Sequence, residues 1–210
     1  MFYYVQVSEP LVKVLRIVDG DKNPMGFLYE AMDSAKEAIQ HLYMSNETKY
    51  RPIWNIIDRR WNRQLHQHIH AAAYYLNPKY YFSNTFKANV EVQIGLDTSI
   101  RRLVADMDLR DIILDELQSY KREEGPLFSS PDCKRRRYTL QPGKKELAFT
   151  FIIPFIFVRE VYWKFYHIIN DFLSLADLWW EDYGATTPNL RQLAIRILSQ
   201  PCNASGCERN

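Results

Sequence analysis

Apolar residues recur along most of this chain at the spacing of one face of an α-helix. The clearest case lies near the end, where Thr187 and Pro188 have the order of an N-cap followed by a first-turn proline. Pro201 follows as a stop signal, so the pattern predicts a helix over residues 188–199. Its apolar face consists of Leu190, Leu193, Ala194, Ile197 and Leu198.

Upstream residues repeat the same helical spacing. Ser8 can cap a helix that starts at Glu9, with Pro10 in its first turn, and Asp108 can cap another. No alternating strand pattern competes with these helices, so the fold class is expected to be mainly α. The remaining predicted helices span residues 25–42, 52–61, 71–76 and 92–103.

Residues 126–142 interrupt the helical pattern. Three prolines flank the run Lys134, Arg135, Arg136 and Arg137, which is typical of a solvated basic linker. Such a run can contact phosphates or act as a nuclear import signal, or it can be a charged loop without a partner. The same alternatives, nucleic-acid contact or a solvated helix face, apply to a second basic patch made of Arg59, Arg60 and Arg63.

Residues 143–177 differ from the rest of the chain in their density of Phe, Ile and Tyr. Their apolar run, 147–158, is too short to span a bilayer as a helix. Gly143-Lys144-Lys145 and Ala176-Asp177 can be encoded across plant-like splice donor and acceptor sites, and T-rich intron sequence encodes Phe, Ile and Tyr. The hypothesis for this insert is therefore a translated retained intron.

Composition narrows the function classes only slightly. The chain has 210 residues and a net charge of +2, which is too close to zero to indicate nucleic-acid binding by itself. Three cysteines provide no disulfide framework, and the first residues lack the basic segment of a secretory signal peptide. These features favour an intracellular protein.

Two groups of segments resemble the hAT family of transposases, in its plant, domesticated-transposase-like branch. Residues 178–210 contain Trp-Trp-Glu, Leu-x-x-Leu-Ala, Leu-Ser-x-Pro and Ser-x-x-Glu-Arg in the order of the family's C-terminal dimerisation region. Segments within residues 1–125, such as IWNIIDRRWNRQLH, resemble the helical region that precedes it. The resemblance does not cover the insert, and it implies that the chain is a fragment of a longer protein.

The resemblance implies a partial RNase H-like fold in which two aspartates and a glutamate hold divalent metal for DNA cleavage. Glu208 matches the family's catalytic glutamate, but the family's two aspartates lie upstream of the helical region. One carboxylate does not make a metal site, so the chain is not expected to be an enzyme. Ser205 and Glu208 also have the spacing of a capping box, which is the structural alternative for Glu208.

Other metal-binding patterns in the sequence are incomplete. His66 and His70 can share a helix face, with His68 between them, but no further ligand completes the set. Cys202 and Cys207 lack a second pair of ligands. Neither a metal nor a cofactor is therefore expected.

The expected function is protein dimerisation by a catalytically inactive, nuclear hAT-derived chain. Its partners would be itself or related hAT proteins, with weak DNA association, no membrane contact and no small-molecule substrate. The alternatives are a helical adaptor for an unrelated protein, or part of an active transposase if upstream exons supply the aspartates. Seven residues are expected to form the dimer contact, to pack on the upstream helices, or to do both, as the family's region does: Trp179, Trp180, Leu190, Leu193, Ala194, Ile197 and Leu198.

Overall fold

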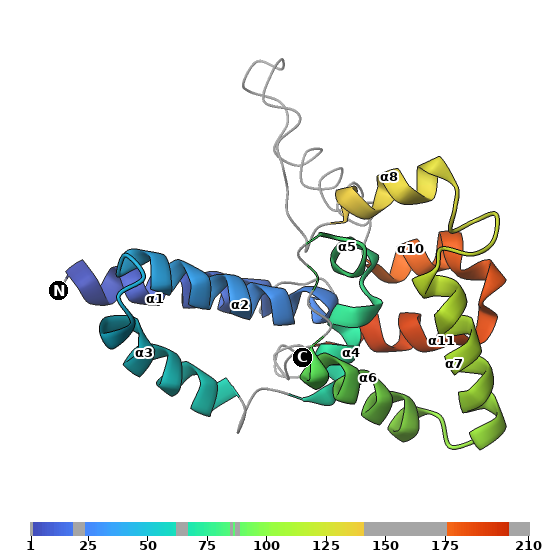
Figure 1. Ribbon diagram of the computed structural model, residues 1–210, viewed down its shortest axis with the longest axis horizontal. Coiled ribbons are helices and arrows are strands. Elements are labelled where there is room, and N and C mark those ends of the chain that lie inside the picture. Colours follow the sequence, from blue (N-terminus) through green and yellow to red (C-terminus); the bar gives the residue numbers. More distant parts are fainter. Residues whose placement is uncertain are drawn as a thin grey trace, which may run out of the picture.

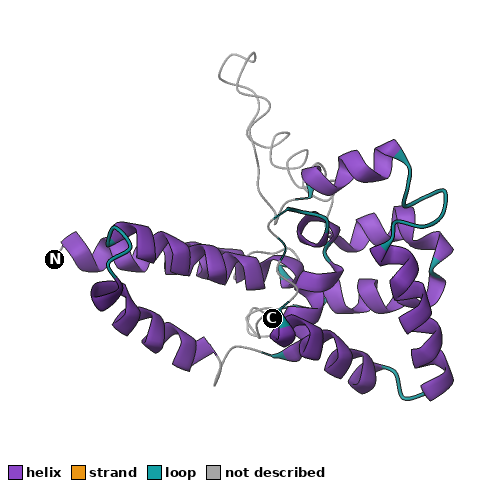
Figure 2. Cartoon of the chain, in the orientation of Figure 1, coloured by secondary structure: helices purple, strands orange, loops and turns teal. Residues whose placement is uncertain are grey.

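The structure, a computed structural model, describes residues 2–18, 24–61, 67–84, 86, 89–140 and 176–201. These residues form helices and the turns between them, and no strand occurs within them (Figure 2). The expectation of a mainly α fold is confirmed. The 35-residue stretch 141–175, which holds nearly all of the insert, lies outside the described residues, as do Arg63, His66 and residues 202–210 with Cys202, Cys207 and Glu208.

Three helices form an arm that extends to one side of the molecule (Figure 1). Helix α2 (Met25–Leu42) packs along α1 (Phe2–Val18) on one side and against α3 (Glu47–Arg60) on the other. A small core lies between them, built around Leu28, Met32 and Ile39 of α2. The arm therefore has a hydrophobic core of its own.

The remaining helices form a compact body around α4, whose residues 70–76 are all buried. Met25, Phe27 and Tyr29, in the first turns of α2, belong to the core of this body, so α2 joins arm and body. The body consists of α4 (His68–Leu76), α5 (Pro78–Tyr81), α6 (Val90–Leu103), α7 (Met107–Lys121), α8 (Pro131–Thr139), α10 (Ala176–Tyr183), the 3-10 turn η2 (Gly184–Thr186) and α11 (Pro188–Leu198).

Small residues let α4 and α6 approach closely. A Cβ added at Gly95 would lie 2.5 Å from the Cβ of Ala71 and 3.0 Å from the carbonyl oxygen of His68. Any larger residue at Gly95 would have to push the two helices apart. The run Ala71–Ala73 has the same effect from the side of α4 and is fully buried.

Asn77 fixes the end of α4 to two neighbours, although its side chain is completely buried. Its Nδ2 donates to the carbonyl oxygen of Gly26 in α2 at 2.9 Å, and its Oδ1 accepts from the backbone N–H of Lys79 at 3.1 Å. Asn77 therefore ends α4, caps α5 and ties both to α2.

Several predicted helix starts were wrong. Helix α1 begins at Phe2 and carries Pro10 inside it, which removes one backbone hydrogen bond from the helix. Helix α3 likewise begins at Glu47 and contains Pro52. The N-cap of α7 is Asp106, whose side chain accepts from the N–H of Asp108 at 3.0 Å, so Asp108 is not the cap.

The expected basic linker, residues 126–142, contains a helix that the sequence did not predict. Most of it forms α8, which Ser130 caps by accepting a hydrogen bond from the N–H of Cys133 at 3.2 Å, with Pro131 at the first helical position. The sequence did not predict this helix because it is mostly charged. Only Cys133 and Arg137 on it are buried, so it has no periodic apolar face. At the other end of the insert, Ala176 and Asp177 belong to α10 and are buried.

Arg137 attaches α8 to the body. Its side chain is 4% exposed, it forms an ion pair with Glu123, and its guanidinium lies 3.7 Å from the ring centroid of Phe82. Its Nη2 donates to the carbonyl oxygen of Phe128 at 3.3 Å. Burial alone would raise the pKa of Glu123, but the hydrogen bonds from Arg137 and Lys134 outweigh it and lower that pKa. The two charges thus stabilise each other.

Replacing Arg137 by Ala is expected to lower the free energy of unfolding by about 2 to 4 kcal/mol, because Glu123 loses its buried partner. Urea unfolding followed by circular dichroism would measure the loss. Arg135→Ala is the control on the same helix, since Arg135 is exposed and pairs with Asp132, and it should cost less than about 0.5 kcal/mol. Equal losses for the two variants would show that Arg137 does not anchor α8.

The hydroxyl of Tyr120 is buried without a hydrogen-bond partner among the described residues, and burial raises its pKa well above the ordinary value. Tyr120→Phe removes an unsatisfied polar atom and keeps the ring contacts with Trp180, Tyr81 and Phe82. We expect the variant to be neutral or more stable by about 1 kcal/mol in the same urea titration. A loss above 1 kcal/mol would contradict this account of the site.

Candidate functional site

The residues expected to form a dimer contact lie in the core of the body. Trp179 and Trp180 are 1% and 0% exposed, and the five apolar residues of α11 are no more than 4% exposed. Helix α11 packs against α4, α7 and α10 of the same chain. Of the two readings that the sequence left open, the structure therefore shows packing on the upstream helices.

Hydrogen bonds also assign the two tryptophans to the core. Trp180 Nε1 donates to the carbonyl oxygen of Leu76 at 2.8 Å, and Trp179 Nε1 donates to that of Cys133 at 3.4 Å. The ring of Trp179 stacks on Phe128, with 5.9 Å between centroids and 9° between planes. Both indole nitrogens and both rings thus have partners within the chain. In this fold, neither side chain is exposed to contact a second subunit.

Glu116 of α7 supplies the N-terminal cap of α11. Its carboxylate accepts from the backbone N–H of Leu190 at 2.6 Å, from that of Asn189 at 3.4 Å and from the Asn189 side chain at 2.9 Å. Thr187, the expected cap, instead donates its hydroxyl to the carbonyl oxygen of Gly184 at 3.4 Å. The sequence did not reveal this cap, because the two partners are 74 residues apart.

The basic run on α8 is paired with carboxylates of the same chain. Lys134 and Arg137 both contact Glu123, Arg135 contacts Asp132, and Arg136 contacts Asp182 of α10. Arg137 is also buried, so it cannot reach a phosphate from its present position. In the second basic patch, Arg59 and Arg60 are exposed at the end of α3. The structure does not gather the residues expected to contact nucleic acid into one unpaired surface.

Of the two histidines with helical spacing, His66 and His70, only His70 is among the described residues. His70 is buried, and its Nδ1 accepts a hydrogen bond from the backbone N–H of Gln67 at 3.3 Å. In the part of the chain that the structure describes, no three His, Cys, Asp or Glu side chains group as metal ligands would. No helix within the described ranges is both long enough and apolar enough to cross a bilayer.

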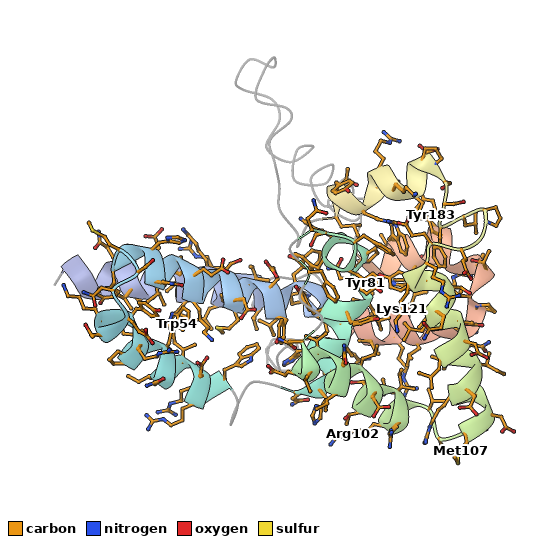
Figure 3. All side chains as sticks on the ribbon, in the orientation of Figure 1. Trp54, Tyr81, Arg102, Met107, Lys121 and Tyr183 are labelled. Atoms are coloured by element: carbon orange, nitrogen blue, oxygen red, sulfur yellow. The ribbon has the colours of Figure 1, made fainter. Side chains whose placement is uncertain are left out.

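A pocket of the body lies between α6 and α7, with a volume of about 640 Å³. Its floor is aromatic, formed by Tyr75, Tyr81, Phe82 and Phe86. Leu96 and Ile100 of α6 form one wall and Leu114 of α7 forms another, while Asp97 and Lys121 lie at the polar edge. Figure 3 shows Tyr81 and Lys121 entering the same region between α5 and the end of α7.

This pocket was not predicted from the sequence, although the sequence contains a sign of it. The stretch 74–86 contains six aromatic residues, more than a short connection between helices needs for packing alone. Burial raises the pKa of both Tyr75 and Tyr81, and these two side chains share a hydrogen bond. An aromatic floor with few polar groups is the usual composition of a ligand site.

Comparisons of the chain with protein-family models, with curated proteins and with solved structures gave no match in any of the three.

Removing the cap on α11 should destabilise the body. Glu116→Ala leaves the first N–H groups of the helix without their acceptor, and the expected loss in the free energy of unfolding is about 1 kcal/mol. Asp115→Ala provides the control, because Asp115 is the preceding residue on α7 and is exposed. If urea unfolding gives the same small change for both variants, the cross-chain cap does not contribute to stability.

Proposed function

We propose that this chain is a non-catalytic helical module that associates with a second copy of itself through the arm formed by α1, α2 and α3. This keeps the dimerisation expected from the sequence but moves the contact from the C-terminal segment to the arm. The observation that carries the proposal is the exposed apolar side of α1. Val12 is 41% exposed and Leu15 is 58% exposed.

Val12 and Leu15 are three residues apart on α1, so they lie on the same side of the helix. Helix α1 packs on α2 through Val14, and no other described helix makes an extensive contact with it. A helix covered on one side only still has apolar surface to bury. A second copy can cover it, because α1 and α2 run antiparallel and two such pairs related by a twofold axis make a four-helix arrangement.

The origin of the chain from a hAT transposase belongs to the same proposal. The order of motifs in residues 178–210 supports this origin. The described residues are also mainly helical, as is the helical region of the family. The RNase H-like fold is proposed only for a longer protein that would include the family's strands. The comparisons lend no weight to this origin.

Nuclear location and weak DNA association remain part of the proposal. The exposed side chains expected to contact phosphates lie on two helices: Arg59 and Arg60 on α3, and Lys134, Arg135 and Arg136 on α8. Three of the four basic residues on α8 are exposed but already face carboxylates. Binding through them would be sequence-independent and would weaken steeply with added salt.

Leu15→Glu places a charge in the proposed contact, and we expect it to convert a dimer into a monomer at tens of micromolar, roughly the weak end of specific association. Sedimentation velocity would measure the change. Met44→Glu is the control, because Met44 is 94% exposed in the turn after α2. Leu193→Asp would not serve, since Leu193 is buried and its replacement tests folding instead.

Two results would count against the arm as the contact. One is a monomeric wild-type chain at that concentration. The other is a dimer that survives Leu15→Glu as well as it survives Met44→Glu. A melting temperature of Leu15→Glu close to that of the wild type would confirm that the exposed substitution leaves the fold intact.

A further inference from the structure

We infer that the pocket between α6 and α7 binds an anionic amphiphile, a molecule with an apolar chain or ring and a single carboxylate. The site is in the body and is independent of the proposed association through the arm. Its volume of about 640 Å³ lies within the range of pockets that enclose small organic ligands.

The apolar part of such a ligand fits the floor and walls. Leu96 and Ile100 line the α6 side of the pocket and Leu114 lines the α7 side. Leu114 is 42% exposed, which leaves apolar surface at the opening that a ligand can cover. Burying this surface supplies the attraction that does not depend on charge.

Lys121 provides the positive charge at the edge of the pocket. It is an exposed residue at the end of α7, and no carboxylate of the described residues forms an ion pair with it. Asp97 also lines the pocket, but Arg101 already neutralises it at 3.0 Å. The unbalanced charge at the edge is therefore positive and favours an anion.

Tyr81 adds a hydrogen-bond donor beside Lys121. Tyr81 lines the same pocket as Lys121, and its hydroxyl can donate a hydrogen bond to a carboxylate oxygen. Together, Lys121 and Tyr81 can contact the two oxygens of one carboxylate.

An aromatic floor can also attract a cation, but the geometry here disfavours it. The ring centroid of Tyr81 lies 4.8 Å from that of Tyr75, 4.8 Å from that of Phe82 and 4.9 Å from that of Phe86. The rings therefore pack on one another and do not form an open cage around an empty centre. A quaternary ammonium group needs the open faces of such a cage.

Isothermal titration calorimetry with decanoate would test the site, with decyltrimethylammonium as the cationic probe of the same chain length. We expect decanoate to bind and the cation to bind at least several-fold more weakly. Lys121→Gln should weaken decanoate about three- to fivefold, the amount of a partly exposed ion pair. The affinity for the cation should not fall in that variant.

Leu114→Trp should abolish decanoate binding, because the larger side chain fills the pocket. Ile112→Trp is the matched control on the same helix, since Ile112 is 47% exposed and does not line the pocket. The inference is overturned if decanoate fails to bind the wild-type chain, if both tryptophan variants behave alike, or if the cation binds as tightly as decanoate. Thermal melting of each variant confirms that it is folded.

Discussion

The buried end of α4 constrains the rest of the body. A helix leaves its last carbonyl groups without partners, and at the centre of a protein no water reaches them. Trp180 satisfies the carbonyl of Leu76 from a position 104 residues later in the chain, and Asn77 links the same point to Gly26 in α2. The helix nearest the middle is thus held by the last segment of the chain and by the arm together.

This constraint explains why the conspicuous Trp-Trp pair belongs to the core. An indole N–H needs an acceptor when it is buried, and a partner subunit is only one source of such an acceptor. Here the acceptors are carbonyl groups of Leu76 and Cys133. The role of this segment depends on which carbonyl groups lie within reach of its two indoles, and the sequence does not state that.

Periodicity predicted most helices because their buried faces are apolar. Helix α6 and helix α11 were placed within two residues of their observed bounds, and Ile113, Leu117 and Tyr120 of α7 are buried at helical spacing. Ile112 is apolar but exposed, since it is one residue off this buried stripe. Periodicity fails where burial is polar. Helix α8 buries an arginine through an ion pair, and no hydrophobicity pattern contains that information.

The candidate sites were harder to predict than the helices for a related reason. A pocket forms where side chains from several segments fail to fill the space between them, and Tyr81, Leu96 and Leu114 come from three different helices. The sequence predicts an apolar face on α1, but it does not say how much of that face α2 covers. The exposed part could therefore not be predicted. The same holds for charge, because Arg101 neutralises Asp97 within α6, while Lys121 at the end of α7 has no carboxylate partner among the described residues. In each case, the surface available to a partner consists of the groups that the chain does not use for its own packing and ion pairs. The function of the chain therefore depends on these exposed groups.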